Sequence, residues 1–159
     1  MAKGDIKVVK QGGDVVKFRT DAAATDLLIG EPAMIGGGGN NYAIALTDAK
    51  PVIATDEFLG IVVRASDHTG SVDGTVLIDV PQTNKTVLRG RAKSAAAIDT
   101  DAELLAILND NVLFDLTSST YTIDESVDGN TAGLMIRDGD IVRGTVDVVV
   151  KEHAMNLLA

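Results

Sequence analysis

Two histidines and a few clustered carboxylates are the residues with the greatest potential for chemistry in this sequence. Asp67, His68 and Asp73 fall within one short polar segment, where a carboxylate beside an imidazole could move a proton. The competing interpretation, which we favour, is that Asp and His in turns hydrogen-bond the local backbone. The second histidine, His153, lies in the tail of the sequence. Neither histidine belongs to a metal-ligand array, so we expect no transition-metal site and no catalytic residue.

A second candidate is the acidic segment 124–128. Asp124, Glu125 and Asp128 form a loose set of oxygen ligands of the kind that calcium prefers. The segment lacks the fixed spacing and the closing glutamate of an EF-hand loop. We therefore expect a solvated acidic loop, and the sequence does not decide whether it binds a divalent ion weakly. The chain has no cysteine, which excludes a disulfide framework and a thiolate site, and we expect no cofactor.

Four consecutive glycines at 36–39 are the third candidate, because glycine-rich loops cradle phosphates. No Lys-Ser/Thr pair follows them, and no helical pattern opens after them. We expect the tip of a hairpin there.

The charge distribution points to a partner other than nucleic acid. The net charge of −9 repels phosphate backbones. Residues 1–20 carry five basic and two acidic residues, a net of +3, which leaves −12 for the remainder. The sequence supports equally a solvated, lysine-bearing edge that deters aggregation and a basic arm that docks on an acidic partner. The basic residues concerned are Lys3, Lys7, Lys10, Lys17 and Arg19.

A smaller basic group lies at Arg89 and Arg91, close to Lys93. It is either the solvated face of a strand or a contact with a subunit or partner. We include Arg89 and Arg91 among the candidate partner-binding residues.

Composition predicts a mainly β protein. Val and Ile together number 30, whereas only five residues are aromatic, and β-branched side chains suit pleated surfaces. A chain of 159 residues is expected to form one domain. We predict a small β-barrel or β-sandwich with one short helix. An N-terminal arm or hairpin (1–20) would precede a single β-rich domain (21–159) that carries a helix-containing insertion near 94–132.

The strands expected at the centre of the fold lie within 58–93. Three runs of alternating side chains, Leu59–Arg64, Thr75–Val80 and Val87–Arg91, predict a β-meander. Ahead of it, Ile6–Lys10 and Asp14–Phe18 flank a Gly-Gly pair and predict a hairpin.

After the predicted meander, the sequence predicts one helix, over 101–109. Thr100 and Glu103 have the spacing of a capping box, and apolar residues follow. We expect its apolar side to cover an open end or an edge of the sheet. Val112–Asp115 and Tyr121–Ile123 are candidate strands, and Asp138-Gly139 predicts a two-residue hairpin turn. No apolar run is long enough to span a membrane.

Three motifs together resemble a known family. Gly30-Glu31-Pro32-Ala33 precedes a strand, Phe58-Leu59-Gly60-Ile61-Val62 forms the next, and Asp73 to Ile78 begins a third. This order resembles the small β-rich capsid decoration (cement) proteins of tailed bacteriophages, over about residues 15–92.

The resemblance implies a non-enzymatic structural protein on the exterior of a phage head. Such a protein binds and stabilises the lattice of the major capsid protein, commonly as a homotrimer. We accordingly expect residues 1–20 to carry much of the attachment, and a chain without them to remain folded.

Other functions also fit parts of the sequence. As a tail-tube, spike or head-fibre component, the chain would still belong to the virion but would have a different role. A small trimeric β-barrel hydrolase needs a metal-binding Asp with a phosphate-gripping Ser/Arg set, which we cannot assemble. A carbohydrate-binding module usually offers aromatic platforms, and this chain has two tyrosines and no tryptophan.

Overall fold

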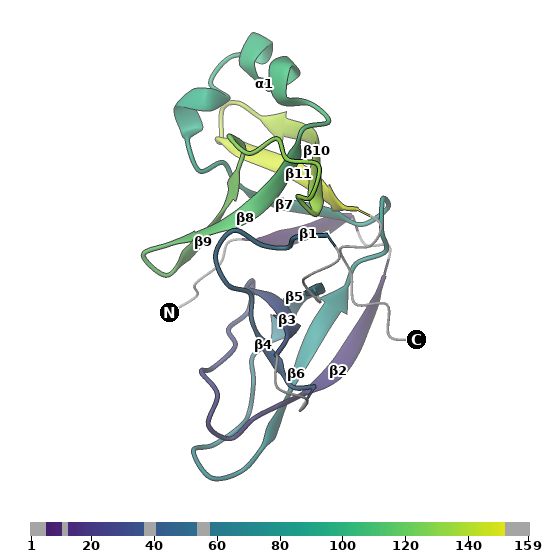
Figure 1. Cartoon of the computed structure of the whole chain (residues 1–159), viewed down its shortest axis with the longest axis vertical. Coiled ribbons are helices and arrows are strands. Elements are labelled where there is room, and N and C mark those ends of the chain that lie inside the picture. Colours follow the sequence, from purple (N-terminus) through teal and green to yellow (C-terminus); the bar gives the residue numbers. More distant parts are fainter. Residues whose placement is uncertain (1–5, 11–12, 37–40, 54–57, 152–159) are drawn as a thin grey trace.

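The molecule is built from two antiparallel β-sheets that form an unclosed sandwich (Figure 1). The computed structural model describes residues 6–10, 13–36, 41–53 and 58–151. The six-stranded sheet and the one α-helix lie at one end of the long axis, and the five-stranded sheet lies at the other. The predicted mainly β class with one short helix is confirmed, and the architecture is the sandwich and not the barrel.

The six-stranded sheet has the order β1-β7-β11-β10-β8-β9, and the five-stranded sheet has the order β2-β6-β5-β3-β4. The first sheet comprises β1 (Lys7–Lys10), β7 (Val87–Arg91), β8 (Asn111–Thr117), β9 (Thr120–Asp124), β10 (Leu134–Asp140) and β11 (Thr145–Val150). The second comprises β2 (Asp14–Thr20), β3 (Pro32–Ile35), β4 (Ala43–Ala45), β5 (Phe58–Arg64) and β6 (Gly74–Val80). The helices are α1 (Asp101–Ile107) and a short 3₁₀ helix over Ala95–Ala97.

The predicted N-terminal hairpin is wrong, although both of its strands exist. β1 pairs with β7 in one sheet, and β2 pairs with β6 in the other. Each strand is held by a different core, because Ile6 is buried in the larger apolar cluster and Phe18 in the smaller one. β1 and β2 are therefore edge strands of the two sheets and do not stand apart as an arm. Removing 1–20 would expose both cores, so we no longer expect the shortened chain to fold.

The predicted meander is only partly correct. β5 and β6 pair antiparallel as expected, but β7 crosses to the six-stranded sheet and lies between β1 and β11. Leu88 of β7 is fully buried in the larger core, which explains the crossing.

The Asp138-Gly139 pair lies inside β10, which contains a bulge between Ile136 and Asp138, and does not form the predicted turn. The chain reverses over 141–144, where Asp140 accepts hydrogen bonds from two backbone N–H groups and Gly144 has a φ of 64°. A Cβ atom on Gly139 would lie 2.8 Å from Leu104 Cδ1. This glycine thus gives α1 room to pack on β10.

The predicted helix and its cap are confirmed. Thr100 accepts a hydrogen bond from the Glu103 backbone N–H, and the Glu103 carboxylate accepts one from the Thr100 backbone N–H. Ile107 and the following Leu108 pack against the larger core, so the helix covers the sheet near β10. Neither helix among the described residues has the length and apolar character needed to cross a bilayer.

Residues 94–132 are not an insertion into the fold. β8 and β9 pair with each other through a turn in which Ser118 and Ser119 both have positive φ, the geometry of a tight hairpin. They contribute Phe114, Tyr121 and Ile123 to the larger core.

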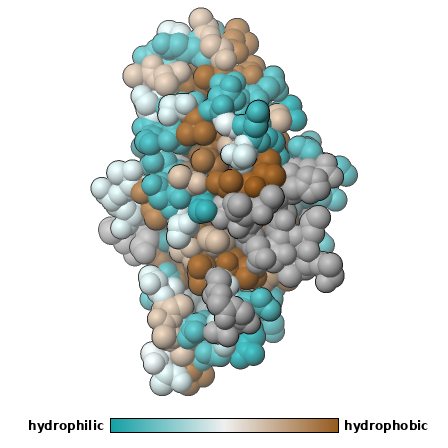
Figure 2. All heavy atoms as spheres, viewed as in Figure 1, coloured by the Kyte–Doolittle hydropathy of each residue, from teal (hydrophilic) through white to brown (hydrophobic). Residues whose placement is uncertain are grey.

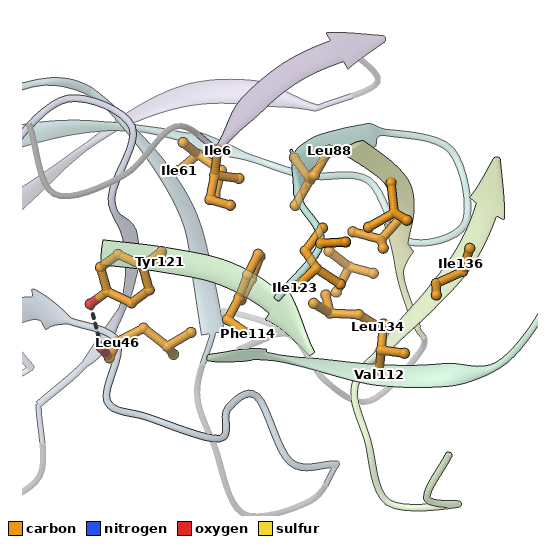
Figure 3. Close-up of a cluster of buried hydrophobic side chains, with 14 of the residues drawn as sticks. Ile6, Leu46, Ile61, Leu88, Val112, Phe114, Tyr121, Ile123, Leu134 and Ile136 are labelled. Atoms are coloured by element: carbon orange, nitrogen blue, oxygen red, sulfur yellow. Dashed lines mark hydrogen bonds between the residues drawn. The ribbon is translucent and has the colours of Figure 1, made fainter. Parts of the chain in front are cut away.

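The larger core joins the two sheets (Figure 3). Phe58 of the five-stranded sheet and Phe114 of the six-stranded sheet meet with ring centroids 6.0 Å apart. The Tyr121 hydroxyl donates a hydrogen bond to the carbonyl of Leu46, which satisfies both buried groups. On the face drawn in Figure 2, the larger hydrophobic areas lie toward the middle of the molecule, where the sheets meet.

Gly90 is a point of close packing within this core. A Cβ atom there would lie 2.7 Å from Ile6 Cδ1 and 3.0 Å from Ile123 Cδ1. Gly90→Ala should lower the free energy of unfolding by about 1 kcal/mol, the lower end for overpacking, because the ends of two isoleucines can shift. Gly70→Ala is the matched control, since a Cβ atom at Gly70 meets nothing within 4 Å. Equal stability of the two variants in urea unfolding would contradict this packing.

Candidate partner-binding surface

Basic residues from the two groups identified in the sequence meet on the outer face of the six-stranded sheet. They are Lys7 of the N-terminal group and Arg89 and Arg91 of the second group. The β1–β7 register places Lys7 opposite Arg89, and the β7–β11 register places Arg91 opposite Thr145. Together with Arg143, these residues line a surface hollow of about 410 Å³. We call Lys7, Arg89, Arg91 and Arg143 the basic patch.

The sequence of β7 explains why its arginines share this face. Successive side chains of a strand point to opposite sides, so Leu88 and Gly90 face the core while Arg89 and Arg91 face outward. β1 follows the same alternation, with Val8 packed against the core and Lys7 exposed.

The four cations of the basic patch differ in how they are neutralised. Arg89 forms a two-pronged ion pair with Asp147, at 2.7 Å from Nε and 2.8 Å from Nη2, and this hydrogen bonding raises the pKa of Arg89. Arg143 has a looser contact of 3.7 Å with Asp140.

Lys7 and Arg91 form no ion pair with any carboxylate in the described part of the chain. The patch therefore presents two uncompensated positive charges on a protein whose net charge is −9.

The other predicted cations lie elsewhere. Lys10 is at the far end of β1, opposite Val87, and Lys17 and Arg19 are on β2 in the other sheet. Arg19 pairs with Asp73 at 3.2 Å and lies 5.9 Å from the centre of the Tyr42 ring. Lys3 is outside the described residues.

Arg143 is the member of the patch that the sequence did not identify as a site residue. It lies in the turn before β11. No local signal marks it, because its place beside Arg91 depends on the pairing of β7 with β11.

The expectation of a solvated acidic loop over 124–128 holds for the exposed Asp128 but is wrong for Glu125. Glu125 is buried, and its carboxylate accepts hydrogen bonds from the backbone N–H groups of Lys93 and Ser94, both at 2.9 Å. The Lys93 ammonium bridges Asp115 and Asp124 at 2.8 Å each, and these hydrogen bonds raise the pKa of Lys93. The carboxylates thus bind protein donors.

No group of three or more metal-ligating side chains occurs in the part of the chain that the structure describes.

Asp67, His68 and Asp73 all hydrogen-bond protein groups, but the favoured interpretation of local backbone bonds holds only for Asp67, because the partners of His68 and Asp73 are distant in the sequence. His68 Nε2 lies 2.9 Å from the carbonyl oxygen of Ala24. Asp67 accepts a hydrogen bond from the Thr75 backbone N–H, which lowers the pKa of Asp67.

Asp73 accepts hydrogen bonds from the Tyr42 hydroxyl at 2.7 Å and from the Ala22 backbone N–H at 3.0 Å. The Tyr42 bond is the main reason that the pKa of Asp73 is lowered. These residues brace loops of the five-stranded sheet.

The glycine-rich segment lies largely outside the described residues, at 37–40. The strands on either side of it, β3 and β4, pair antiparallel, which is the arrangement expected of a hairpin.

Comparisons with known proteins assign no family to this fold and surface. No protein-family model matches the chain, and no curated protein matches it either.

The two acceptor bonds of Glu125 generate a stability prediction. Glu125→Gln replaces one acceptor oxygen by an NH₂ group that faces a backbone donor. The free energy of unfolding should therefore fall by about 1–3 kcal/mol. Asp128→Asn is the matched control, because Asp128 is exposed and its single bond, to the Asn111 N–H, is 3.4 Å long. Thermal melts check both. If the control lost as much stability as Glu125→Gln, the buried carboxylate would not be the cause.

Proposed function

We propose that this chain is a non-enzymatic structural protein that binds an acidic surface of a larger assembly through the basic patch. The assembly that we favour is the head of a tailed bacteriophage. The chain would sit on the exterior of the capsid and stabilise the lattice of the major capsid protein.

The observation that carries this proposal is the pair of uncompensated cations on an acidic protein. Lys7 and Arg91 project from the same sheet face, on either side of the paired Arg89. Exposed cations that lack partners keep their full attraction for an incoming anionic surface, whereas paired ones are already neutralised. The strongly negative remainder would orient the molecule, because the basic patch attracts an acidic partner and the acidic remainder repels one.

The resemblance to decoration proteins supports the choice of assembly. Its three motifs lie on or beside three neighbouring strands, β3, β5 and β6. Gly30 donates a hydrogen bond to the Val62 carbonyl, and Val62 donates one to the Glu31 carbonyl, both at 2.9 Å. The motif pattern thus describes one continuous piece of the five-stranded sheet. It is independent of the basic patch, which lies on the other sheet.

A homotrimer also fits the sandwich. Among the described residues, the terminal strands β1, β2 and β4 each pair with one strand only, whereas the outer edge of β9 is partly occupied where Ile123 bridges Ala92. Unpaired edges attract other chains, and assembly into a closed oligomer would cover some of them.

Charge reversal in the basic patch tests the attachment. The double variant Lys7→Glu/Arg91→Glu should bind heads assembled from the major capsid protein of the same genome at least about tenfold more weakly, as measured by co-sedimentation. Binding of the unmodified chain should weaken steadily as salt is added, because the interaction is electrostatic.

Lys17→Glu is the matched control, since Lys17 is exposed and lies on the other sheet. It should bind nearly as well as the unmodified chain. Equal losses of binding in the control and the double variant would show that the basic patch is not the attachment surface. Open-ended polymers in light scattering would favour a tail-tube component instead.

A further inference from the structure

A second hollow lies between the two sheets, along the free edge of β1. It has a volume of about 550 Å³ and is lined by residues 6–9, 29–30, 61–63 and Asp79. Four successive residues line it from the β1 side. Since alternate side chains of a strand point to opposite faces, the hollow must follow the edge of β1 and not one of its faces. We call this hollow the edge groove.

The walls of the edge groove are accessible and largely apolar, with Lys7 as the one cation of the lining. Val9, Ile29 and Val63 are 43%, 58% and 39% exposed, and all three line it. Large exposed apolar side chains gathered at one place mark an interaction surface more often than scattered ones do.

The groove also holds an unsatisfied buried acid. Asp79 is only 4% exposed, and its Oδ1 has no hydrogen-bond partner among the described residues. Val15 and Ile61 flank it in the β2–β6 and β5–β6 ladders, which explains its desolvation. Burial, followed by the negative charge of Asp14, raises the pKa of Asp79. A buried carboxylate of this kind is costly unless a donor reaches it, so the site is complementary to a cation.

The edge of β1 supplies the third element. β1 is the terminal strand of its sheet, and within the described ranges it pairs with β7 alone, so its other side offers backbone groups that no described strand pairs. An extended chain that enters the groove can pair with this edge, place apolar side chains against Val9 and Val63, and direct a basic side chain at Asp79.

We infer that the edge groove binds an extended apolar segment of a partner protein, which adds a strand to β1 and presents one lysine or arginine to Asp79. This inference does not depend on the virion assignment, although the edge groove and the hollow at the basic patch share Lys7 and Val9. Apolar walls and an unpaired strand edge favour a peptide, and the lone acid determines which side chain it must carry.

The test begins with a library of random short peptides selected on the immobilised chain. Selected peptides should combine β-branched or other apolar residues with one Lys or Arg at a fixed position. Methylating the backbone nitrogens on one edge of a selected peptide should weaken binding about tenfold in fluorescence anisotropy, because those N–H groups pair with β1. Methylating the alternate nitrogens should have little effect. Equal effects of the two sets would overturn strand addition.

Two variants of the chain test the walls and the acid. Val63→Glu should abolish binding of the selected peptide, whereas Val72→Glu, a control at an exposed valine outside the groove, should not. Replacing the peptide's Lys by norleucine should weaken binding to the unmodified chain about tenfold but hardly affect binding to Asp79→Asn. Thermal melts verify that each variant is folded.

Three results would overturn the inference: no enriched peptide, peptides that bind Val63→Glu and Val72→Glu equally, or an unchanged Lys preference in Asp79→Asn. A concentration-dependent dimer that Val63→Glu dissociates would assign the groove to a second copy of the chain and would also overturn it.

Discussion

The contact that the rest of the structure depends on is the one between Gly90, Ile6 and Ile123. Gly90 has no side chain, and Ile6 and Ile123 occupy the space that a Cβ atom would need. Ile6 is thereby buried in the larger core and anchors the start of β1 beside β7. Gly90 faces the core, and because successive side chains of β7 point to opposite faces, Arg89 and Arg91 point outward. The missing side chain at Gly90 is thus linked to the packing of the core, the position of the edge strand and the charged surface.

The two sheets divide the molecule into parts with different roles. The six-stranded sheet carries the basic patch on its outer face and contributes most of the larger core. The five-stranded sheet has a smaller core of its own, and Phe58 and Ile61 of β5 also reach the larger one. Because β1 and β2 join different sheets, the N-terminal segment ties both edges to the body. The edge groove lies where this division leaves β1 uncovered on one side.

Features that depend on neighbours in sequence could be predicted. Helix α1 follows from the Thr100–Glu103 capping box, and the strands follow from β-branched alternation. Pairing partners could not be predicted in the same way. Gly-Gly after Lys10 fits a hairpin, but Ile6 and Phe18 gain more burial in separate cores. Asp138-Gly139 fits a turn, but the space that Leu104 requires explains the glycine.

The candidate surface was predictable only in part for the same reason. Arg89 and Arg91 were identified as one basic group, and Lys7 as part of another, but their meeting depends on the β1–β7 pairing. Arg143 belongs to the basic patch only because the pairing of β7 with β11 places the turn before β11 beside Arg91. Glu125 resembled a solvent-exposed acid because the two backbone donors that it satisfies lie about 30 residues earlier in the chain. Asp79 looked like the polar member of an alternating strand, and only the packing of both sheets shows that it is buried and unpaired.

The most direct test of the proposed attachment is electron cryo-microscopy of heads incubated with the chain. The account predicts density on the exterior of the shell, with β1, β7 and β11 facing the capsid and Lys7 and Arg91 in contact with acidic side chains. Density in which this sheet faces solvent, or heads that acquire no exterior density, would contradict it.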